Sequence, residues 1–161
     1  AVVMMCKYTL PFMARGGHII NMASSSAWLP LPYFSIYAAT KAFVRHFSLA
    51  LGEELASSGV GVTAVSPLWM NTEFIDIARD SPEGDAVDRF LILYEPRQTA
   101  VLALTDALSG KAESVTRAQK LIRRAVSLLP ENTSMLLWNK IRKKRNALPS
   151  LSLHPLPPAG Q

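Results

Sequence analysis

The segment of residues 60–66, Val-Gly-Val-Thr-Ala-Val-Ser, is apolar almost throughout and rich in β-branched residues. It lacks the alternation of polar and apolar side chains that marks a strand with one face in water. Such a segment is typical of a strand buried on both faces, as in parallel sheets covered by helices. Pro67 ends it, because proline has no amide hydrogen for the strand ladder. The chain is therefore predicted to contain a buried parallel sheet.

Helices and strands alternate around this segment. Residues 18–23 are predicted to form a second buried strand, and residues 35–57 a long helix between the two strands. Residues 1–14 are predicted to form a helix that Gly16 and Gly17 end. An apolar residue at every fourth position of the long helix predicts a buried stripe of Phe43, Phe47 and Leu51. This order predicts an α/β fold with a partial Rossmann-like, doubly wound parallel sheet.

The rest of the chain is predicted to be mainly helical. A helix fits residues 97–108, and two amphipathic basic helices fit residues 115–129 and 134–145. Residues 68–95 are predicted to form a loop with short helical pieces. Four prolines in residues 148–161 favour a disordered or extended tail. The predicted parts are the α/β part at residues 1–110, a basic α-helical C-terminal extension at 111–147 and the proline-rich tail at 148–161.

Charge is distributed unevenly along the chain. Residues 1–110 carry 7 Lys/Arg and 10 Asp/Glu, for a net charge of −3, whereas residues 111–161 carry 10 and 2, for a net charge of +8. The basic character therefore belongs to the extension, which argues against nucleic-acid binding by the protein as a whole. Cations beside leucines in residues 117–145 leave two alternatives, a solvated or packed helix face and peripheral contact with a membrane surface.

The single cysteine, Cys6, excludes an internal disulfide and makes the reducing cytoplasm the expected compartment, with membrane association through the extension as the alternative. No segment reaches the ~18 apolar residues that a membrane-spanning helix requires. The three histidines are scattered along the sequence, and no metal site is predicted.

Three side chains able to handle a proton are predicted to meet at one edge of the sheet. Ser24 follows the first strand, and Tyr37 and Lys41 lie one turn apart near the start of the long helix. In open parallel sheets, ligands bind just outside the carboxyl ends of the strands, where Ser24 and Pro67 lie. Two simpler interpretations compete, in which Ser25 or Ser26 replaces Ser24, or Tyr37 and Lys41 form an ordinary surface pair. The spacing Ser-x12-Tyr-x3-Lys favours a site.

This combination of groups suits hydride chemistry at a carbinol carbon. A tyrosine hydroxyl is a weak acid at neutral pH, and a nearby ammonium favours its phenolate form. Such a tyrosine can give or take a proton as hydride moves to or from the carbon. A serine hydroxyl can hydrogen-bond the same oxygen and stabilise the charge that develops on it.

Three segments together resemble the short-chain dehydrogenase/reductase family. They are Gly-His-Ile-Ile-Asn-Met-Ala-Ser at residues 17–24, Tyr-Ala-Ala-Thr-Lys at residues 37–41 and Val-Thr-Ala-Val-Ser-Pro at residues 62–67. Tyr-x3-Lys alone is a weak pattern, but a serine thirteen residues earlier on this strand–helix–strand frame is specific. The resemblance is clear from about residue 4 to residue 74. It implies an oxidoreductase that interconverts a ketone and a secondary alcohol with NAD or NADP. It also implies homo-oligomers formed through the long helix and the helix before the strand, with Phe43, Phe47 and Leu51 in the interface as the alternative to a buried stripe.

The resemblance also implies roles for individual residues. Tyr37 would be the general acid/base, Ser24 would position and polarise the substrate oxygen, and Lys41 would tune Tyr37 and hold the nicotinamide ribose. The segment Pro-Leu-Trp-Met-Asn-Thr at residues 67–72 is similar to the family's nicotinamide loop, Pro-Gly-x-x-x-Thr, with leucine in place of glycine. The implied cofactor contacts are Tyr37, Lys41, Pro67, Leu68, Met70 and Thr72.

Two tryptophans follow the two strands and are candidates for a substrate pocket. Trp28 and Trp69, together with Leu29 and Phe34, would suit an apolar substrate. The alternative is that these side chains serve only in packing.

The family's glycine-rich phosphate loop, Gly-x-x-x-Gly-x-Gly, does not occur in the sequence. Together with the ribose-selecting residue and the catalytic asparagine, it is expected to precede Ala1. The chain by itself is therefore expected to bind cofactor poorly and to be inactive, because the diphosphate has no cradle. The alternative function is a non-catalytic binding or scaffold protein that keeps the same fold.

Overall fold

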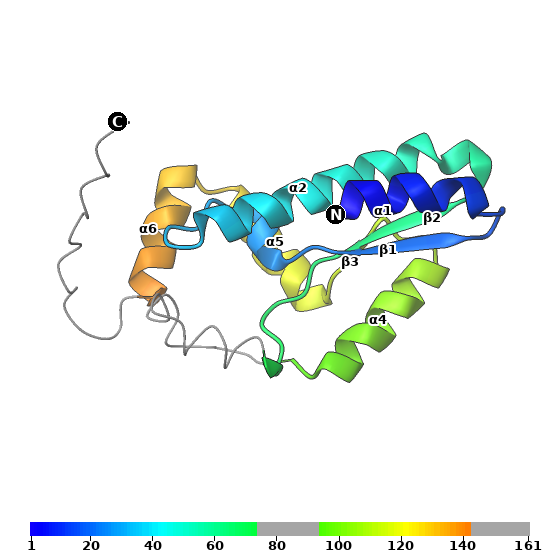
Figure 1. Ribbon diagram of the computed structural model, residues 1–161. Coiled ribbons are helices and arrows are strands. Elements are labelled where there is room, and N and C mark those ends of the chain that lie inside the picture. The colour runs from blue at the N-terminus through cyan, green and yellow to red at the C-terminus, as the bar shows by residue number, and fades with distance from the viewer. Residues whose placement is uncertain (74–93, 143–161) are drawn as a thin grey trace, which may run out of the picture.

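The computed structural model describes residues 1–73 and 94–142 (Figure 1). Its centre is a parallel sheet with the strand order β1-β2-β3. Helices α1 and α2 lie together on one face of the sheet, and α4 lies on the other. The predicted α/β fold with a helical C-terminal part is therefore confirmed. In chain order the elements are α1 (Val2–Thr9), η1 (Leu10–Phe12), β1 (His18–Met22), η2 (Ser25–Trp28), α2 (Ser35–Glu54), η3 (Ala56–Ser58), β2 (Gly61–Val65), α4 (Pro96–Leu108), β3 (Glu113–Ser114), α5 (Arg117–Ser127) and α6 (Glu131–Arg142).

Two local features differ from the sequence prediction. Residues 25–28 form a short 3-10 helix that was not predicted. The Ser24 Oγ caps it by accepting a hydrogen bond from the Ser26 amide at 3.2 Å. Strand β3 was not predicted, and it pairs with β2 from within the region assigned to the extension. Most of the predicted loop at residues 68–95 and all of the tail at residues 148–161 lie outside the described residues.

A small apolar core joins α1, α2 and β2. The buried side chains of Cys6, Leu51 and Val62 form its centre. Gly52 of α2 faces β2, and a Cβ added at this position would make ordinary van der Waals contact with the Cβ of Val62 at 3.5 Å. The partly buried residues packed around this centre are Val2, Leu10, Ile19, Phe47 and Leu55.

The predicted buried stripe of α2 is wrong at Phe43, which is 54% exposed. A step of four residues turns a helix by about 40° beyond one full turn, so a stripe at every fourth position winds away from the sheet. The prediction holds at Leu51, which is buried, and in part at Phe47, which is partly buried against the core. The buried residues of α2 are Ala38, Val44, Ser48 and Leu51.

Polar side chains also link the strands to each other and to α2. The Asn21 Nδ2 of β1 donates to the Ser48 Oγ on α2 at 2.9 Å. On the other face, Thr63 donates to the Lys111 carbonyl at 2.6 Å and lies 2.9 Å from the His18 Nε2. Because Thr63 has one hydroxyl hydrogen, the His18 Nε2 must be the donor in that contact. Burial lowers the pKa of His18, which agrees with a neutral ring in this position.

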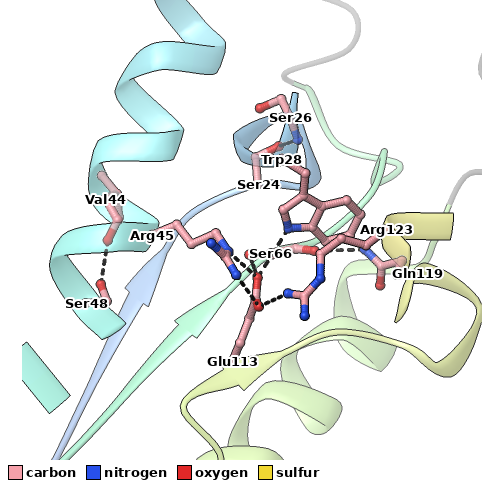
Figure 2. Close-up of polar contacts among 10 residues, drawn as sticks. All are labelled: Ser24, Ser26, Trp28, Val44, Arg45, Ser48, Ser66, Glu113, Gln119 and Arg123. Carbon is pink, nitrogen blue, oxygen red and sulfur yellow. Dashed lines mark hydrogen bonds and ion pairs between the residues drawn. The ribbon is translucent and has the colours of Figure 1, made fainter. Parts of the chain in front are cut away.

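The carboxylate of Glu113 joins four separate segments (Figure 2). Its Oε1 accepts hydrogen bonds from the Arg45 Nε at 2.8 Å, the Ser66 Oγ at 2.9 Å and the Trp28 Nε1 at 3.3 Å. Its Oε2 accepts from the Arg45 Nη2 at 3.0 Å and from the Arg123 Nη1. The four donors come from η2, α2, the end of β2 and α5. This cluster of five residues is called the Glu113 network below.

The Glu113 side chain is only 10% exposed, yet it is held as a carboxylate. Burial alone would raise the pKa of Glu113, but the hydrogen bonds and charge of Arg45, with help from Ser66 and Trp28, lower it to about 2. The negative charge is therefore part of the fold at neutral pH.

Replacing this charge should destabilise the protein. The variant Glu113→Gln keeps the size of the side chain but leaves the partly buried Arg45 without its counter-ion. We expect the free energy of unfolding in urea to fall by about 3 kcal/mol, because breaking a buried ion pair strands the remaining charge. The matched control is Glu54→Gln, which removes an exposed carboxylate of α2. Equal stabilities of the two variants would contradict the role given to Glu113.

The lowered pKa of Glu113 also predicts how the stability of the protein depends on pH. Because the pKa of Glu113 is lowered in the folded protein from 4.5 to about 2, its stabilising contribution is present above about pH 4.5. It should be lost as the pH falls from about 4.5 toward about 2. Urea unfolding across this window should show a shallower loss of stability in Glu113→Gln than in the wild type. Parallel curves for the two proteins would count against the assignment.

Candidate functional site

The segment after β1 runs beside the segment after β2. The Ala23 amide donates to the Val65 carbonyl at 2.8 Å, and the Ser25 amide donates to the Pro67 carbonyl at 2.9 Å. Ser24 lies between these two contacts, in extended backbone with a φ of −168°. Its hydroxyl oxygen accepts a hydrogen bond from the Ser26 amide. This contact does not use the hydroxyl hydrogen of Ser24. Ser24 and Pro67 therefore lie at adjacent carboxyl ends of the sheet, as the sequence predicts.

Tyr37 and Lys41 are half-buried and lie one turn apart near the start of α2. The Lys41 Nζ is 5.8 Å from the centroid of the Tyr37 ring. The same ammonium donates to the carbonyl oxygen of Met22, the last residue of β1, at 2.9 Å. Burial lowers the pKa of Lys41. Lys41 thus ties the helix that carries Tyr37 to the strand that leads into Ser24.

Aromatic side chains cover this edge. Phe34 makes edge-to-face contacts with Tyr37 and Trp69, each with ring centroids 6.1 Å apart. A third edge-to-face contact, at 6.2 Å, joins Phe34 to Trp138 of α6. The Trp138 Nε1 also donates to the Pro32 carbonyl at 3.0 Å. The helical extension therefore reaches the edge where Tyr37 lies, a contact that the sequence analysis missed because it joins residues 106 positions apart.

The two tryptophans predicted for a substrate pocket lie in different surroundings. Trp69 packs on Phe34, beside Tyr37. Trp28 donates its indole N–H to Glu113, and the guanidinium of Arg123 lies 6.0 Å from its ring centroid. The indole of Trp28 is therefore part of the Glu113 network, and Leu29 beside it is half-buried.

The loop at residues 67–72 accommodates Leu68 at the position where the similar Pro-Gly-x-x-x-Thr loop has glycine. Among the described residues, Tyr33 is the one non-glycine residue with a positive φ, at 70°, so Leu68 lies outside the left-handed region. The loop is held by an isolated parallel bridge between Met70 and Tyr94. Pro67 and Leu68 line a cavity of about 160 Å³ at the carboxyl end of β2, together with Tyr94, Gln98, Thr99, Ser114, Thr116 and Gln119. Thr72, the last predicted cofactor contact, is half-buried.

Sequence reasoning missed the residues that hold the site in place. Glu113 and Arg45 are 68 positions apart, and no local pattern marks either as a partner of the other. Arg45 follows Lys41 by one helical turn, so the Glu113 network anchors the same face of α2 that carries Lys41.

Comparisons with known proteins agree with this geometry. The family described as short chain dehydrogenase matches residues 1–82. The very-long-chain 3-oxoacyl-CoA reductase of Rattus norvegicus is 37% identical over 95 residues, which cover 56% of this chain and 30% of that protein. The match thus spans less than a third of the length of this curated relative.

Two solved structures share the fold. A short-chain dehydrogenase from Sphingobium yanoikuyae in complex with NADPH superposes with a TM-score of 0.56 and 27% identity, covering 81% of this chain and 48% of that one. The F189W actinorhodin polyketide ketoreductase with NADPH gives a TM-score of 0.53 and 26% identity, covering 65% of this chain and 46% of that one. The family match covers half of the sequence, including the frame that carries Ser24, Tyr37 and Lys41, and the chain therefore belongs to the short chain dehydrogenase family.

Proposed function

We propose that the protein interconverts a ketone and a secondary alcohol with a nicotinamide cofactor, and that Tyr37 is its general acid/base. The observation that carries this proposal is the placement of the Lys41 ammonium, which lies beside the Tyr37 ring and is bonded to the end of β1. A positive charge in this position stabilises the phenolate that remains when the tyrosine gives up its proton.

In the direction of reduction, Tyr37 gives its proton to the substrate oxygen as the carbonyl carbon receives hydride. The Ser24 hydroxyl donates a hydrogen bond to the same oxygen and stabilises the negative charge that develops there. In the direction of oxidation, Tyr37 as phenolate takes the proton back. The nicotinamide supplies or accepts the hydride when it is bound.

The residues of this chain fit the nicotinamide end of the cofactor. An ammonium has three N–H groups. One N–H of Lys41 donates a hydrogen bond to the Met22 carbonyl, so the others can donate to the ribose hydroxyls. The cavity beside Pro67 and Leu68 lies next to this edge. NADPH in the two solved relatives supports NAD or NADP as the cofactor. The sequence has no glycine-rich loop for the diphosphate, so we propose that turnover requires that further element.

The substrate is proposed to be a ketone on a largely apolar molecule. Phe34 and Trp69 provide an apolar wall beside Tyr37. Two relatives support this class by name, one as a very-long-chain 3-oxoacyl-CoA reductase and the other as a polyketide ketoreductase.

Removing the phenol should abolish most of the turnover. In the complete gene product, supplied with NADPH or NADH and a panel of ketones and 3-oxoacyl thioesters, Tyr37→Phe should lower kcat by roughly 10²- to 10⁴-fold, because the proton donor is lost. The matched control is Tyr8→Phe, which removes an exposed phenol on α1. Near-native circular dichroism would show that both variants fold. Unchanged turnover in Tyr37→Phe would refute the catalytic role and favour a binding protein.

We further propose that the protein forms homo-oligomers through α1 and α2. Large apolar side chains of these two helices stay exposed, including Met5 on α1 at 66% and Phe43 on α2 at 54%. The rings of Phe43 and Phe47 stack with centroids 6.0 Å apart. Covering such side chains removes apolar surface from water, which favours association.

A charge placed on this surface should weaken the association. We expect Phe43→Asp to shift the sedimentation velocity profile toward the monomer, because the introduced carboxylate would be desolvated in the contact. The control Glu54→Lys changes a charge at an exposed site of the same helix without removing apolar surface. A monomeric wild type, or an oligomer that Phe43→Asp leaves intact, would rule out this interface.

A further inference from the structure

Helix α5 is fixed to the rest of the protein by its polar side. Gln119 is buried, and its Nε2 donates to the carbonyl oxygen of Ser66 at 2.8 Å. Arg123, one turn later, pairs with Glu113. Figure 2 shows both side chains reaching from α5 toward the end of β2 and β3. A capping box between Thr116 and Gln119 fixes the first turn. These polar contacts set the rotation of α5 about its axis.

The apolar side of α5 consequently faces solvent. Leu121 is 66% exposed and Leu128 is 85% exposed, although leucines at this spacing normally form the buried stripe of an amphipathic helix. Ile122 is also exposed on this helix, and Leu128 and Leu129 directly follow its last residue, Ser127. Helix α6 continues the pattern with Leu136, which is 70% exposed, and Leu137. The two helices thus present apolar side chains outward, in the reverse of the usual arrangement.

Positive charge accompanies these side chains. Arg117, Lys120 and Arg124 are exposed on α5, and their spacing places them along one edge of the leucine stripe. Lys140 is exposed on α6, and Glu131 is the one acidic residue of these two helices. Arg123 is already paired with Glu113, so the outward charge comes from the other cations.

We propose that α5 and α6 form a surface that docks on an anionic lipid bilayer. Apolar side chains beside Lys and Arg match the interface of such a bilayer, where leucines enter the acyl region and cations meet the phosphate groups. A second copy of this chain would fit poorly, since it would bring the same cations against each other. No described helix is long and apolar enough to span a membrane. The proposal does not depend on the enzymatic function.

The docking surface borders the proposed active site. Trp138 lies on α6 and packs on Phe34, which also contacts Tyr37. Figure 1 shows α6 at the end of the molecule where α2 begins. A bilayer beneath α5 and α6 would therefore lie close to the edge that receives the substrate.

Vesicle co-sedimentation of the complete gene product tests the proposal. Phosphatidylcholine vesicles containing phosphatidylserine should bind the protein, and pure phosphatidylcholine vesicles should bind it much more weakly. Raising the salt from about 0.05 M to about 0.5 M should release it, because the screening length shortens several-fold. The double variant Arg117→Gln, Arg124→Gln should bind about thirtyfold more weakly, at about fivefold per cation.

Two further variants separate the apolar contribution from folding defects. Leu121→Ser, Leu128→Ser should weaken binding by at least about tenfold per leucine, and both sites are exposed, so the fold is retained. The matched control, Leu104→Ser, Leu108→Ser, removes exposed leucines of α4 and should bind like the wild type. No binding to anionic vesicles at low salt, equal binding to neutral vesicles or equal loss in the α4 control would overturn the proposal. So would self-association that both α5 variants abolish in the absence of lipid.

Discussion

The position of the proposed active-site residues depends on the hydrogen bonds and ion pairs of the Glu113 carboxylate. The carboxylate receives donors from η2, α2, the end of β2 and α5, and three of these segments adjoin a proposed functional residue. Trp28 lies on the turn that Ser24 caps, Arg45 follows Lys41 by one helical turn, and Ser66 precedes Pro67. A buried charge is stable only when it is well paired, so these segments are held where the carboxylate can reach them.

Much of the fold could be predicted because its signals are local. The buried strand at residues 60–66 and the long helix before it leave clear patterns of apolar residues. Strand β3 could not be foreseen, since it has two residues and exists because β2 offers it a free edge. Phe43 was misplaced for a different reason. The face of α2 that meets the sheet carries Ala38, Val44, Ser48 and Leu51, and Phe43 turns away from it.

The candidate site also has one part that local sequence signals predict and another part that they do not. Ser24, Tyr37 and Lys41 lie within eighteen consecutive residues, so their spacing on the strand–helix–strand frame predicts that they meet at one edge of the sheet. The partners that support them come from far along the chain, as with Arg45 and Glu113, or Phe34 and Trp138. The amphipathic character of α5 was evident in the sequence, but its orientation was not. Gln119 and Arg123 turn inward because Ser66 and Glu113 supply partners for them, and no pattern within α5 reveals that.

The convergence of donors on Glu113 also limits how this protein can change over generations. Replacing Glu113 alone would strand Arg45 and Arg123 without a counter-ion, and replacing either arginine alone would remove part of the compensation for a buried charge. Each single step therefore passes through a less stable intermediate. The five residues of the network should be inherited as a block, so that related sequences hold either the whole set or a different set of matched residues. Substitutions should then accumulate slowly on the faces of α2 and α5 that meet the carboxylate, whatever selection acts on their outer faces.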